Sequence, residues 1–328
     1  MFGAGVQKVF RQLNITSEFE LIHFHSPIPV VTGLLDGKIT KSVLTCGDPA
    51  IGNARQENLV SDALRIGRGL SNFTQVGSFV FQRAAVELVD KVIVVSENLK
   101  KAIERVHRLA SSKVVVIHPG VDTDIFRPVK DLEGASAKIG LPRLTPTILC
   151  PARISPLKAQ LNLIEAIPRL KSHIGKVRVL FVGQIIDSRY YREIVTRSRN
   201  LRVGDCVEFK GVVSAEIFPL YYATADVVVL PSTTEGLPSS LLEAMSCGRP
   251  IVATDIPGNR EAVADNRGAL LVPVNSPDML ADKIATAIAD KEVKENALED
   301  GMKIAHREYA WPSIASKTIN LYREVIAG

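Results

Sequence analysis

The sequence predicts an α/β protein made of doubly wound parallel sheets in two domains. In the second half, apolar runs of four or five residues alternate with amphipathic helical segments, the pattern of strand–helix–strand units. The chain has 328 residues, which is enough for two domains that each bury a core. A polar stretch at residues 129–146, punctuated by glycine and proline, has the composition of a linker between them.

Composition limits the classes of function. With 46% hydrophobic and 23% charged residues, the chain is typical of a globular protein rather than a fibrous or disordered one. The net charge of +5 is compatible with weak attraction to anionic lipid surfaces or to nucleotide-linked substrates. No interleaved aromatic and basic pattern is present, so we expect no nucleic-acid partner.

The compartment is predicted from cysteines and hydropathy. The four cysteines are widely spaced and lack a C-x-x-C pair, so we expect neither a disulfide nor a metal site. No signal peptide opens the chain and no apolar run is long enough to span a membrane. These features predict a cytoplasmic protein whose membrane contact is peripheral, at the inner face.

The first half, residues 1–128, contains four candidate strands that a parallel sheet would bring together. A glycine-bearing turn leads into an amphipathic helix at 6–13, and helical pattern recurs at 58–88. Ligands of open parallel sheets bind beyond the carboxyl ends of strands, so His25, Asp48 and His118 are expected at a cleft. His23 and His25 share one strand, and we expect only one of them to point each way. The candidate strands are residues 19–25, 42–46, 91–95 and 113–117.

The second half alternates strands and helices with short connections, which predicts a second doubly wound sheet. Its candidate strands are residues 147–151, 178–182, 206–209, 226–230, 250–254 and 268–272. Its candidate helices are residues 159–171, 188–200, 215–223, 240–247, 259–264 and 277–289. A last helix opens at Trp311.

One stretch, PSTTEGLPSSLLEAMSCGRPIVATD at 231–255, carries the chemistry of this half. Glu235 on a loop and Glu243 in the first helical turn flank a helix N-terminus. Such a terminus offers unpaired amides and a positive dipole end to an anion such as a diphosphate, and the acids can accept hydrogen bonds from sugar hydroxyls. On spacing alone, a capping box from Ser240 to Glu243 and a solvated loop acid at Glu235 explain the pattern equally well.

A second basic loop, ARISPLK at 152–158, follows the first strand of this half. The guanidinium of Arg153 offers a planar fork for phosphate oxygens, and Lys158 supplies a mobile point charge. Two basic residues on a loop are more often plain surface charge.

The E-x7-E pair with its filling EGLPSSLLEAMSCGRPIVAT resembles the donor-binding signature of retaining glycosyltransferases of the GT-B fold, in particular family four. ARISPLK is similar to the family's G-R-x-x-x-x-K pattern, with Ala152 and Ala159 in place of glycines. GVDTDIFRP resembles the segment that ends the family's first domain, which favours a turn at Asp122 over the metal-binding D-x-D of the GT-A fold. YAWPSIASKTINLYREVI resembles the family's final helix.

The resemblance implies two Rossmann-like domains facing a cleft: an acceptor-side domain at 1–128, shortened at its start, and a nucleotide-sugar domain at 147–310. The helix at 311–328 would cross back to the first domain. Arg153, Lys158 and Glu235 are implied as catalytic residues. The implied donor-binding residues are Gly183, Val213, Leu237, Pro238, Ser239, Ser240 and Glu243.

Two departures concern the acceptor side. Ala4-Gly5 stands where the family has a double glycine, and the histidine of the family's T-x-H pattern is Gly47 here. The implied acceptor-side residues are therefore Gly5, His25 and Asp48. The pattern implies neither a metal nor a cofactor, because Arg153, Lys158 and helix amides would stabilise the diphosphate.

The sequence thus predicts a retaining, metal-independent hexosyltransferase. Its donor would be a UDP- or GDP-linked sugar, and its acceptor a lipid-linked glycan or a polysaccharide. The shortened start and the missing histidine favour an alternative, an inactive sugar-nucleotide-binding subunit that works with a partner. A GT-B-like epimerase of nucleotide sugars is a more remote reading, since it would need more acids and histidines in the cleft.

Overall fold

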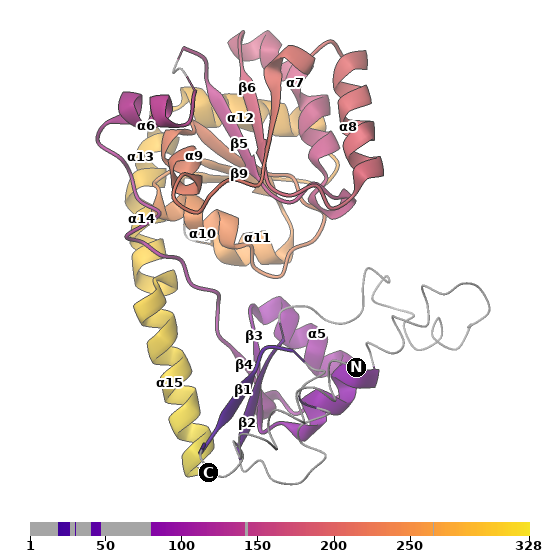
Figure 1. Ribbon diagram of the computed structural model, residues 1–328, viewed down its shortest axis with the longest axis vertical. Helices are drawn as coiled ribbons and strands as arrows, with labels where there is room; N and C mark the ends of the chain where they lie inside the picture. Colours follow the sequence, from indigo (N-terminus) through magenta and orange to yellow (C-terminus); the bar gives the residue numbers. More distant parts are fainter. Residues whose placement is uncertain (1–18, 27–29, 31–40, 47–79, 142–143, 265) are drawn as a thin grey trace, which may run out of the picture. The chain divides into compact units, whose positions relative to one another are not determined.

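The computed structural model describes residues 19–26, 30, 41–46, 80–141, 144–264 and 266–328 (Figure 1). The chain divides into two compact units. Unit 1 is Met1–His118 together with Ala315–Gly328, and unit 2 is Pro119–Ile314. Each unit has its own sheet, and every strand pairing is parallel. The predicted fold class, two α/β units with parallel sheets, is confirmed.

Unit 1 has a sheet that runs in chain order in its described part, β1–β2–β3–β4. The strands coincide with the four predicted ones, and none is longer than predicted. Phe24, Leu44 and Val92 are buried in its core, which α5 (Glu97–His107) helps to cover. Residues 80–88 are helical and form the described end of the predicted helix at 58–88. The strands are β1 (Ile22–Phe24), β2 (Ser42–Cys46), β3 (Lys91–Val94) and β4 (Val114–Val116).

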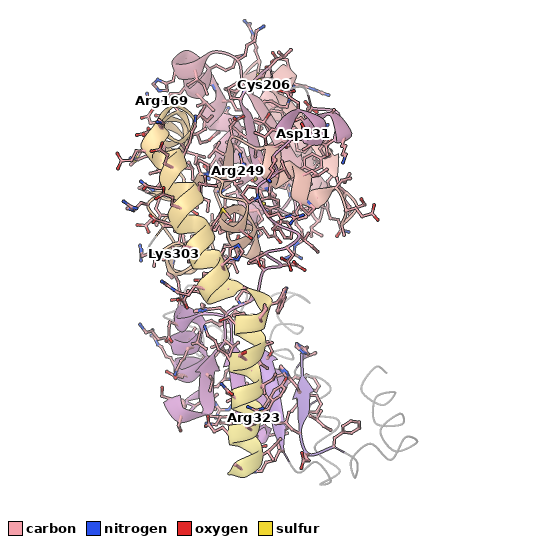
Figure 2. All side chains as sticks on the ribbon, turned by 90° about the vertical axis from the view of Figure 1, so that its left-hand side faces the viewer. Asp131, Arg169, Cys206, Arg249, Lys303 and Arg323 are labelled. Atoms are coloured by element: carbon pink, nitrogen blue, oxygen red, sulfur yellow. The ribbon has the colours of Figure 1, made fainter. Side chains whose placement is uncertain are left out.

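The final helix, α15 (Trp311–Ala327), begins at the predicted residue and contributes its later turns to unit 1. Arg323, labelled in Figure 2, lies on this part of α15. The Tyr322 hydroxyl lies 2.5 Å from Nδ1 of His23, and Lys91 Nζ lies 2.9 Å from a carboxylate oxygen of Glu324. These contacts attach the helix to strands β1 and β3.

Unit 2 contains, in its described part, a six-stranded sheet in the order β10–β9–β8–β5–β6–β7. The order reverses between β5 and β8, because the chain first builds the sheet outward on one side and then returns to build the other. In sheets of this kind, ligands bind outside the carboxyl ends of the strands at that reversal. The strands are β5 (Thr147–Pro151), β6 (Arg178–Val182), β7 (Val207–Gly211), β8 (Val227–Leu230), β9 (Ile251–Thr254) and β10 (Ala269–Val272).

Helices cover both faces of this sheet, as right-handed crossovers require when the strand order reverses. α7, α8 and α12 share one buried core with alternate residues of the strands, among them Ile148, Phe181 and Val229. The strands β5, β6, β8 and β9 are buried along nearly their whole length and read as apolar runs, whereas β7 is half-buried and includes Glu208 and Lys210. The helices are α7 (Gln160–Ile174), α8 (Ser188–Asn200), α9 (Phe218–Thr224), α10 (Ser239–Ser246), α11 (Pro257–Ala262) and α12 (Pro277–Ala289).

Two stretches of unit 2 differ from the sequence prediction. The predicted linker at 129–146 contains a helix, α6 (Leu132–Lys138), because the Asp131 carboxylate caps it at the Gly134 amide and Ala135 is buried. Between α12 and α15 the chain stays largely helical, through α13 (Lys291–Asn296), two π-helical segments and α14 (Met302–Ile304). Lys303 on α14 is labelled in Figure 2.

The core of unit 2 generates the first prediction. Phe181 is 1% exposed and stacks on Phe209 with ring centroids 5.1 Å apart. Replacing Phe181→Ala should lower the free energy of unfolding of unit 2 by about 3–5 kcal/mol, from lost burial and the cavity left behind. Trp311 is the only tryptophan of the chain and packs against Gly120, so its fluorescence in a urea titration reports this unit. Val212→Ala, at a side chain 77% exposed, is the control and should change little.

Candidate functional site

The two loops that carry the predicted basic and acidic residues follow β5 and β8, the adjacent strands at the reversal of strand order. A backbone contact joins the loops directly. The Thr233 amide donates to the Leu157 carbonyl at 2.9 Å, and the Thr233 hydroxyl donates to the same oxygen at 3.2 Å. Segments 76 residues apart in sequence are therefore held side by side at the carboxyl edge of the sheet.

Lys158 and Glu235 meet in this place. The Lys158 ammonium donates to a carboxylate oxygen of Glu235 at 2.5 Å, and their side chains are 20% and 10% exposed. Cys150 lies beneath them at the end of β5, and burial raises the pKa of its thiol to about 12, with smaller opposing effects of the two charges. The thiol therefore stays protonated.

The loop after β5 has a fixed backbone. A short turn, Pro156–Lys158, ends at Ala159, which adopts a left-handed conformation with φ 48° and ψ 39°. Glycine takes such a conformation with less strain, so Ala159 carries a backbone cost that the family's glycine avoids. The side-chain amide of Gln160 donates to the Arg153 carbonyl at 2.9 Å and holds the start of the loop.

Arg153 shares this loop with Lys158, and its side chain is exposed. Within the described part of the chain, no ion pair holds its guanidinium. The structure therefore brings the Arg153 backbone to the site and leaves its charge available to a ligand.

Gly183, at the end of β6, allows the loops after β5 and β6 to touch. A Cβ atom there would lie 2.3 Å from the Ala152 carbonyl oxygen, and its φ of +154° also disfavours a side chain. Its amide donates to the Gly211 carbonyl at 2.8 Å. Gly183 therefore acts through backbone packing. Val213, another predicted donor-binding residue, lies half-buried just beyond the end of β7.

The loop after β8 is supported from behind by α11. A Cβ atom on Gly258 would lie 2.5 Å from the carbonyl oxygens of both Glu235 and Gly236. Only a residue without a side chain permits this approach. The sequence offered no spacing signal for Gly258, because its role depends on contact between two loops.

Helix α10 begins at Ser239, with Pro238 as the N-cap and no side-chain cap. Leu237 and Pro238 are buried and anchor the turn. The amides of Ser239 and Ser240 have no backbone acceptor among the described residues, so they remain available at the positive end of the helix dipole.

Glu243 does not cap this helix, so the capping-box reading is wrong. The helix starts two residues earlier than a box with Ser240 as N-cap requires, and the carboxylate instead accepts a hydrogen bond from the Tyr222 hydroxyl of α9. Burial raises the pKa of Glu243, and the bond from Tyr222 works in the opposite direction. One oxygen of a largely buried carboxylate is thus oriented by Tyr222, a partner that the sequence pattern did not identify.

The acceptor-side predictions concern unit 1. Gly5 and Asp48 lie outside the described residues, as does Gly47. His25 is exposed and stacks on His23, with ring centroids 4.4 Å apart. The expectation that the two rings point opposite ways is wrong, because side chains two residues apart along a strand share a face.

His23 is held in place and uncharged. It contacts the hydroxyls of Tyr322 and Thr45, the latter at 2.7 Å. Burial, followed by the nearby His25, lowers the pKa of His23 to about 4. His23 therefore has a packing role, and His25 is the exposed member of the pair.

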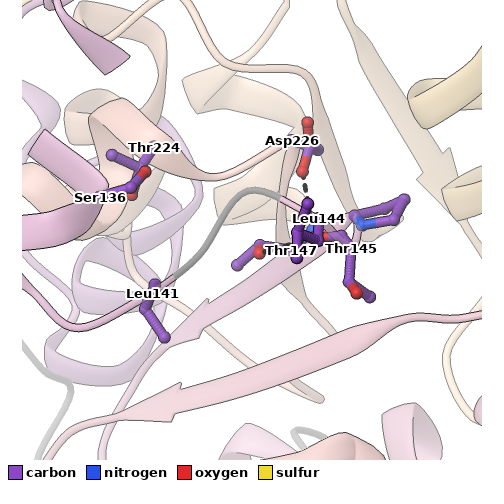
Figure 3. Close-up of a pocket in the computed structure, with 8 residues that line it drawn as sticks. Ser136, Leu141, Leu144, Thr145, Thr147, Thr224 and Asp226 are labelled. Atoms are coloured by element: carbon purple, nitrogen blue, oxygen red, sulfur yellow. Dashed lines mark hydrogen bonds between the residues drawn. The ribbon is translucent and has the colours of Figure 1, made fainter. Parts of the chain in front are cut away.

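A separate cavity of about 150 Å³ lies at the other edge of the unit 2 sheet, at the amino ends of β5 and β8 (Figure 3). Asp226 accepts a hydrogen bond there from the Thr147 amide at 2.7 Å, which fixes the entry into β5. Ser136 and Thr224 also line this cavity. It shares no residue with the loops at the carboxyl edge.

The described residues contain no group of three or more His, Cys, Asp or Glu side chains placed to hold a metal ion. Asp122 accepts hydrogen bonds from the amides of Asp124 and Ile125, each at 3.1 Å, so it closes a turn as predicted. No helix in the described part is long and apolar enough to cross a membrane.

Two parallel-sheet α/β units, with the reversal point of the second lined by a basic and an acidic loop, define the GT-B class of fold. Residues 133–303, more than half of the chain, match the family described as Glycosyl transferases group 1, and residues 2–125 match Glycosyltransferase Family 4. The chain belongs to the group 1 glycosyl transferases.

The chain is similar in sequence to several named glycosyltransferases. The D-inositol 3-phosphate glycosyltransferase of Mycobacteroides abscessus is 31% identical over 251 residues, 76% of this chain and 55% of the relative. A GDP-mannose-dependent alpha-(1-6)-phosphatidylinositol monomannoside mannosyltransferase of Mycobacterium tuberculosis is 29% identical over 212 residues, 62% of this chain and 54% of the relative. The chain therefore spans just over half the length of these curated relatives.

Solved structures agree in fold. Anabaena Alr3699/HepE in complex with UDP and glucose superposes with a TM-score of 0.80 at 21% identity, covering 97% of this chain and 80% of that chain. Sucrose-phosphate synthase (tll1590) from Thermosynechococcus elongatus gives a TM-score of 0.77 at 24% identity, covering 98% and 77%. At these identities the likeness establishes the GT-B fold.

The contact between Tyr222 and Glu243 generates the second prediction. Tyr222→Phe removes a hydrogen bond to a carboxylate and should lower the free energy of unfolding at pH 7 by about 1.5–3 kcal/mol. Without that bond the pKa of Glu243 rises further. A carboxyl pKa that is raised in the folded protein destabilises the fold only at pH values above the pKa of the same carboxyl in the unfolded chain. The loss of stability should therefore shrink below about pH 4.3.

The measurement is urea unfolding at pH 7 and at a pH below about 4.3, in the wild-type and Glu243→Gln backgrounds. In the Gln background the effect of Tyr222→Phe should no longer depend on pH. A loss that is the same in both backgrounds and at both pH values would show that Tyr222 acts through packing alone.

Proposed function

We propose that the protein transfers a hexose from a UDP- or GDP-linked sugar to a lipid-linked or polysaccharide acceptor, with retention of anomeric configuration and without a metal ion. The observation that carries the proposal is the meeting of Lys158 and Glu235 at 2.5 Å beside the free N-terminus of α10. A cation, an acid and unpaired amides are there combined at the reversal point of a parallel sheet.

The charge of the leaving group explains the cationic side of the site. Breaking the bond between the anomeric carbon and the diphosphate leaves a nucleotide diphosphate anion and a cation-like sugar. Fixed positive charge aimed at the diphosphate lowers that barrier, and one such donor is typically worth about 10²–10³ in rate. Arg153, Lys158 and the amides of Ser239 and Ser240 supply that charge.

The acids have a different role. Glu235 accepts hydrogen bonds from hydroxyls of the donor sugar, and in the unliganded protein it holds the Lys158 ammonium in place. Glu243 has one carboxylate oxygen bonded by Tyr222, which leaves the other for the ribose hydroxyls. Neither acid serves as a nucleophile, because the family pattern implies front-face attack.

Relatives support the donor and acceptor classes. One relative's name specifies GDP-mannose and a phosphatidylinositol mannoside, another inositol 3-phosphate, and one structural neighbour holds UDP and glucose. The phosphatidylinositol mannoside in one of these names supports a lipid-linked acceptor, which would place the protein at the inner face of the membrane. The replacement of the family's histidine by Gly47 supports the second candidate, an inactive sugar-nucleotide-binding subunit.

The third prediction tests the site. Lys158→Ala and Glu235→Ala should each reduce release of free UDP or GDP from the sugar nucleotides by at least about tenfold, through loss of contacts made in the transition state. Release is measured with and without an acceptor extract. Lys291→Ala, an exposed lysine on α13 of the same unit, is the control. Unchanged rates in both site variants would remove the assignment, and donor binding without release in the wild type would favour the inactive subunit.

The fourth prediction concerns the reaction course. Treatment with EDTA should leave nucleotide release unchanged, because protein charges take the place of a metal. Proton NMR of the product should give the same anomeric configuration as the donor. Activity lost to EDTA and restored by Mn²⁺, or an inverted product, would contradict the proposal.

A further inference from the structure

The outer side of α8 carries an unusual concentration of positive charge. Arg189, Arg192, Arg197 and Arg199 are all exposed, and we call them the arginine face. Glu193 is the single acid within this helix. One element therefore presents four guanidinium groups to solvent, in a chain whose whole net charge is only +5.

The arrangement of these residues follows from the helical repeat. Tyr190, Ile194 and Ser198 are buried, so side chains on the opposite side of the helix face outward. Figure 1 places α8 at the outer margin of unit 2. The exposed side of the helix also carries Glu193, Thr196 and Asn200.

The fold does not use most of this charge. Arg197 pairs with Glu165 of α7 at 2.9 Å, but within the described residues no ion pair involves Arg189, Arg192 or Arg199. Arg199 is in the last turn, where a cation stabilises the helix dipole. Arg189 is in the first turn, where a cation opposes it, so helix stability does not account for its presence.

The neighbouring residues indicate the chemistry of a partner. Tyr190 is buried and Tyr191 packs edge-on against Phe209, so the face offers no aromatic platform on which nucleobases could stack. The loop just before the helix exposes two aliphatic side chains, Ile185 (40%) and Ile186 (53%). Arginines beside exposed aliphatic side chains suit the interface of an acidic lipid bilayer.

We propose that the arginine face of α8 docks unit 2 on membranes that contain anionic phospholipids. The inference rests on the lipid-linked acceptor of the proposed function, since an enzyme that modifies such an acceptor works at a bilayer surface. Binding is mainly electrostatic, so it requires acidic head groups and weakens as salt screens them.

The test is co-sedimentation of the full chain with vesicles of phosphatidylglycerol and phosphatidylcholine in equal amounts. A basic residue near an acidic surface contributes about fivefold in affinity, so Arg189→Gln, Arg192→Gln and Arg199→Gln together should weaken binding on the order of 100-fold. The control removes three exposed charges elsewhere in unit 2, through Lys291→Gln, Lys294→Gln and Arg307→Gln, and should bind more tightly than the α8 variant. α13, which carries both lysines of the control set, lies at the opposite side of the unit from α8 (Figure 1).

Several outcomes would overturn the proposal. These are equal weakening by both triple variants, binding by the α8 variant that equals wild type, no wild-type binding to acidic vesicles, or equal binding to pure phosphatidylcholine. Preferential binding of a single-stranded oligonucleotide, lost in the α8 variant, would assign the face to nucleic acid instead. The donor site is tested separately: nucleotide release without acceptor should be unchanged in the α8 variant, and vesicle binding should be unchanged by Lys158→Ala.

Discussion

The contact between Lys158 and Glu235 depends on one topological constraint, the adjacency of β5 and β8. The chain leaves β5, builds β6 and β7 on one side, and returns to place β8 on the other side of β5. Two loops far apart in sequence then leave the sheet at the same edge. Thr233 bonds to the Leu157 carbonyl, and the ammonium and carboxylate meet at 2.5 Å. The other features of the site are arranged around this pair.

Charges this poorly exposed lose most of their hydration, and the gain from pairing them only roughly offsets that loss. The ion pair is therefore better understood as a positioning device than as a source of stability. The same holds for Glu243, whose burial raises its pKa and whose orientation comes from the Tyr222 hydroxyl. Gly183 and Gly258 contribute by the absence of side chains, because each lets one loop touch the backbone of another.

The unit 2 strands and the loops that bear Arg153, Lys158 and Glu235 could be predicted because their signals are local. Buried parallel strands are continuous apolar runs, and the E-x7-E spacing lies within one strand–helix–strand unit. The errors arose where local patterns permit two outcomes. Ser240 and Glu243 have the spacing of a capping box, but the Glu243 carboxylate accepts a hydrogen bond from the buried Tyr222 instead. Residues 129–146 have a linker composition, but Asp131 and a few buried apolar residues sufficed for a helix.

By itself the sequence determined the α/β class, the order of strands and helices and the residue types available for an anion site. These features depend on periodicity and turn chemistry, which involve only residues that are close together in the sequence. Only the tertiary structure decided which of them meet: the closeness of Lys158 to Glu235, the partner of Glu243, the backbone contacts of Gly183 and Gly258, and the stacking of His23 on His25. Such contacts join residues whose separation along the chain carries no periodic signal, so they exist only once the sheets have assembled.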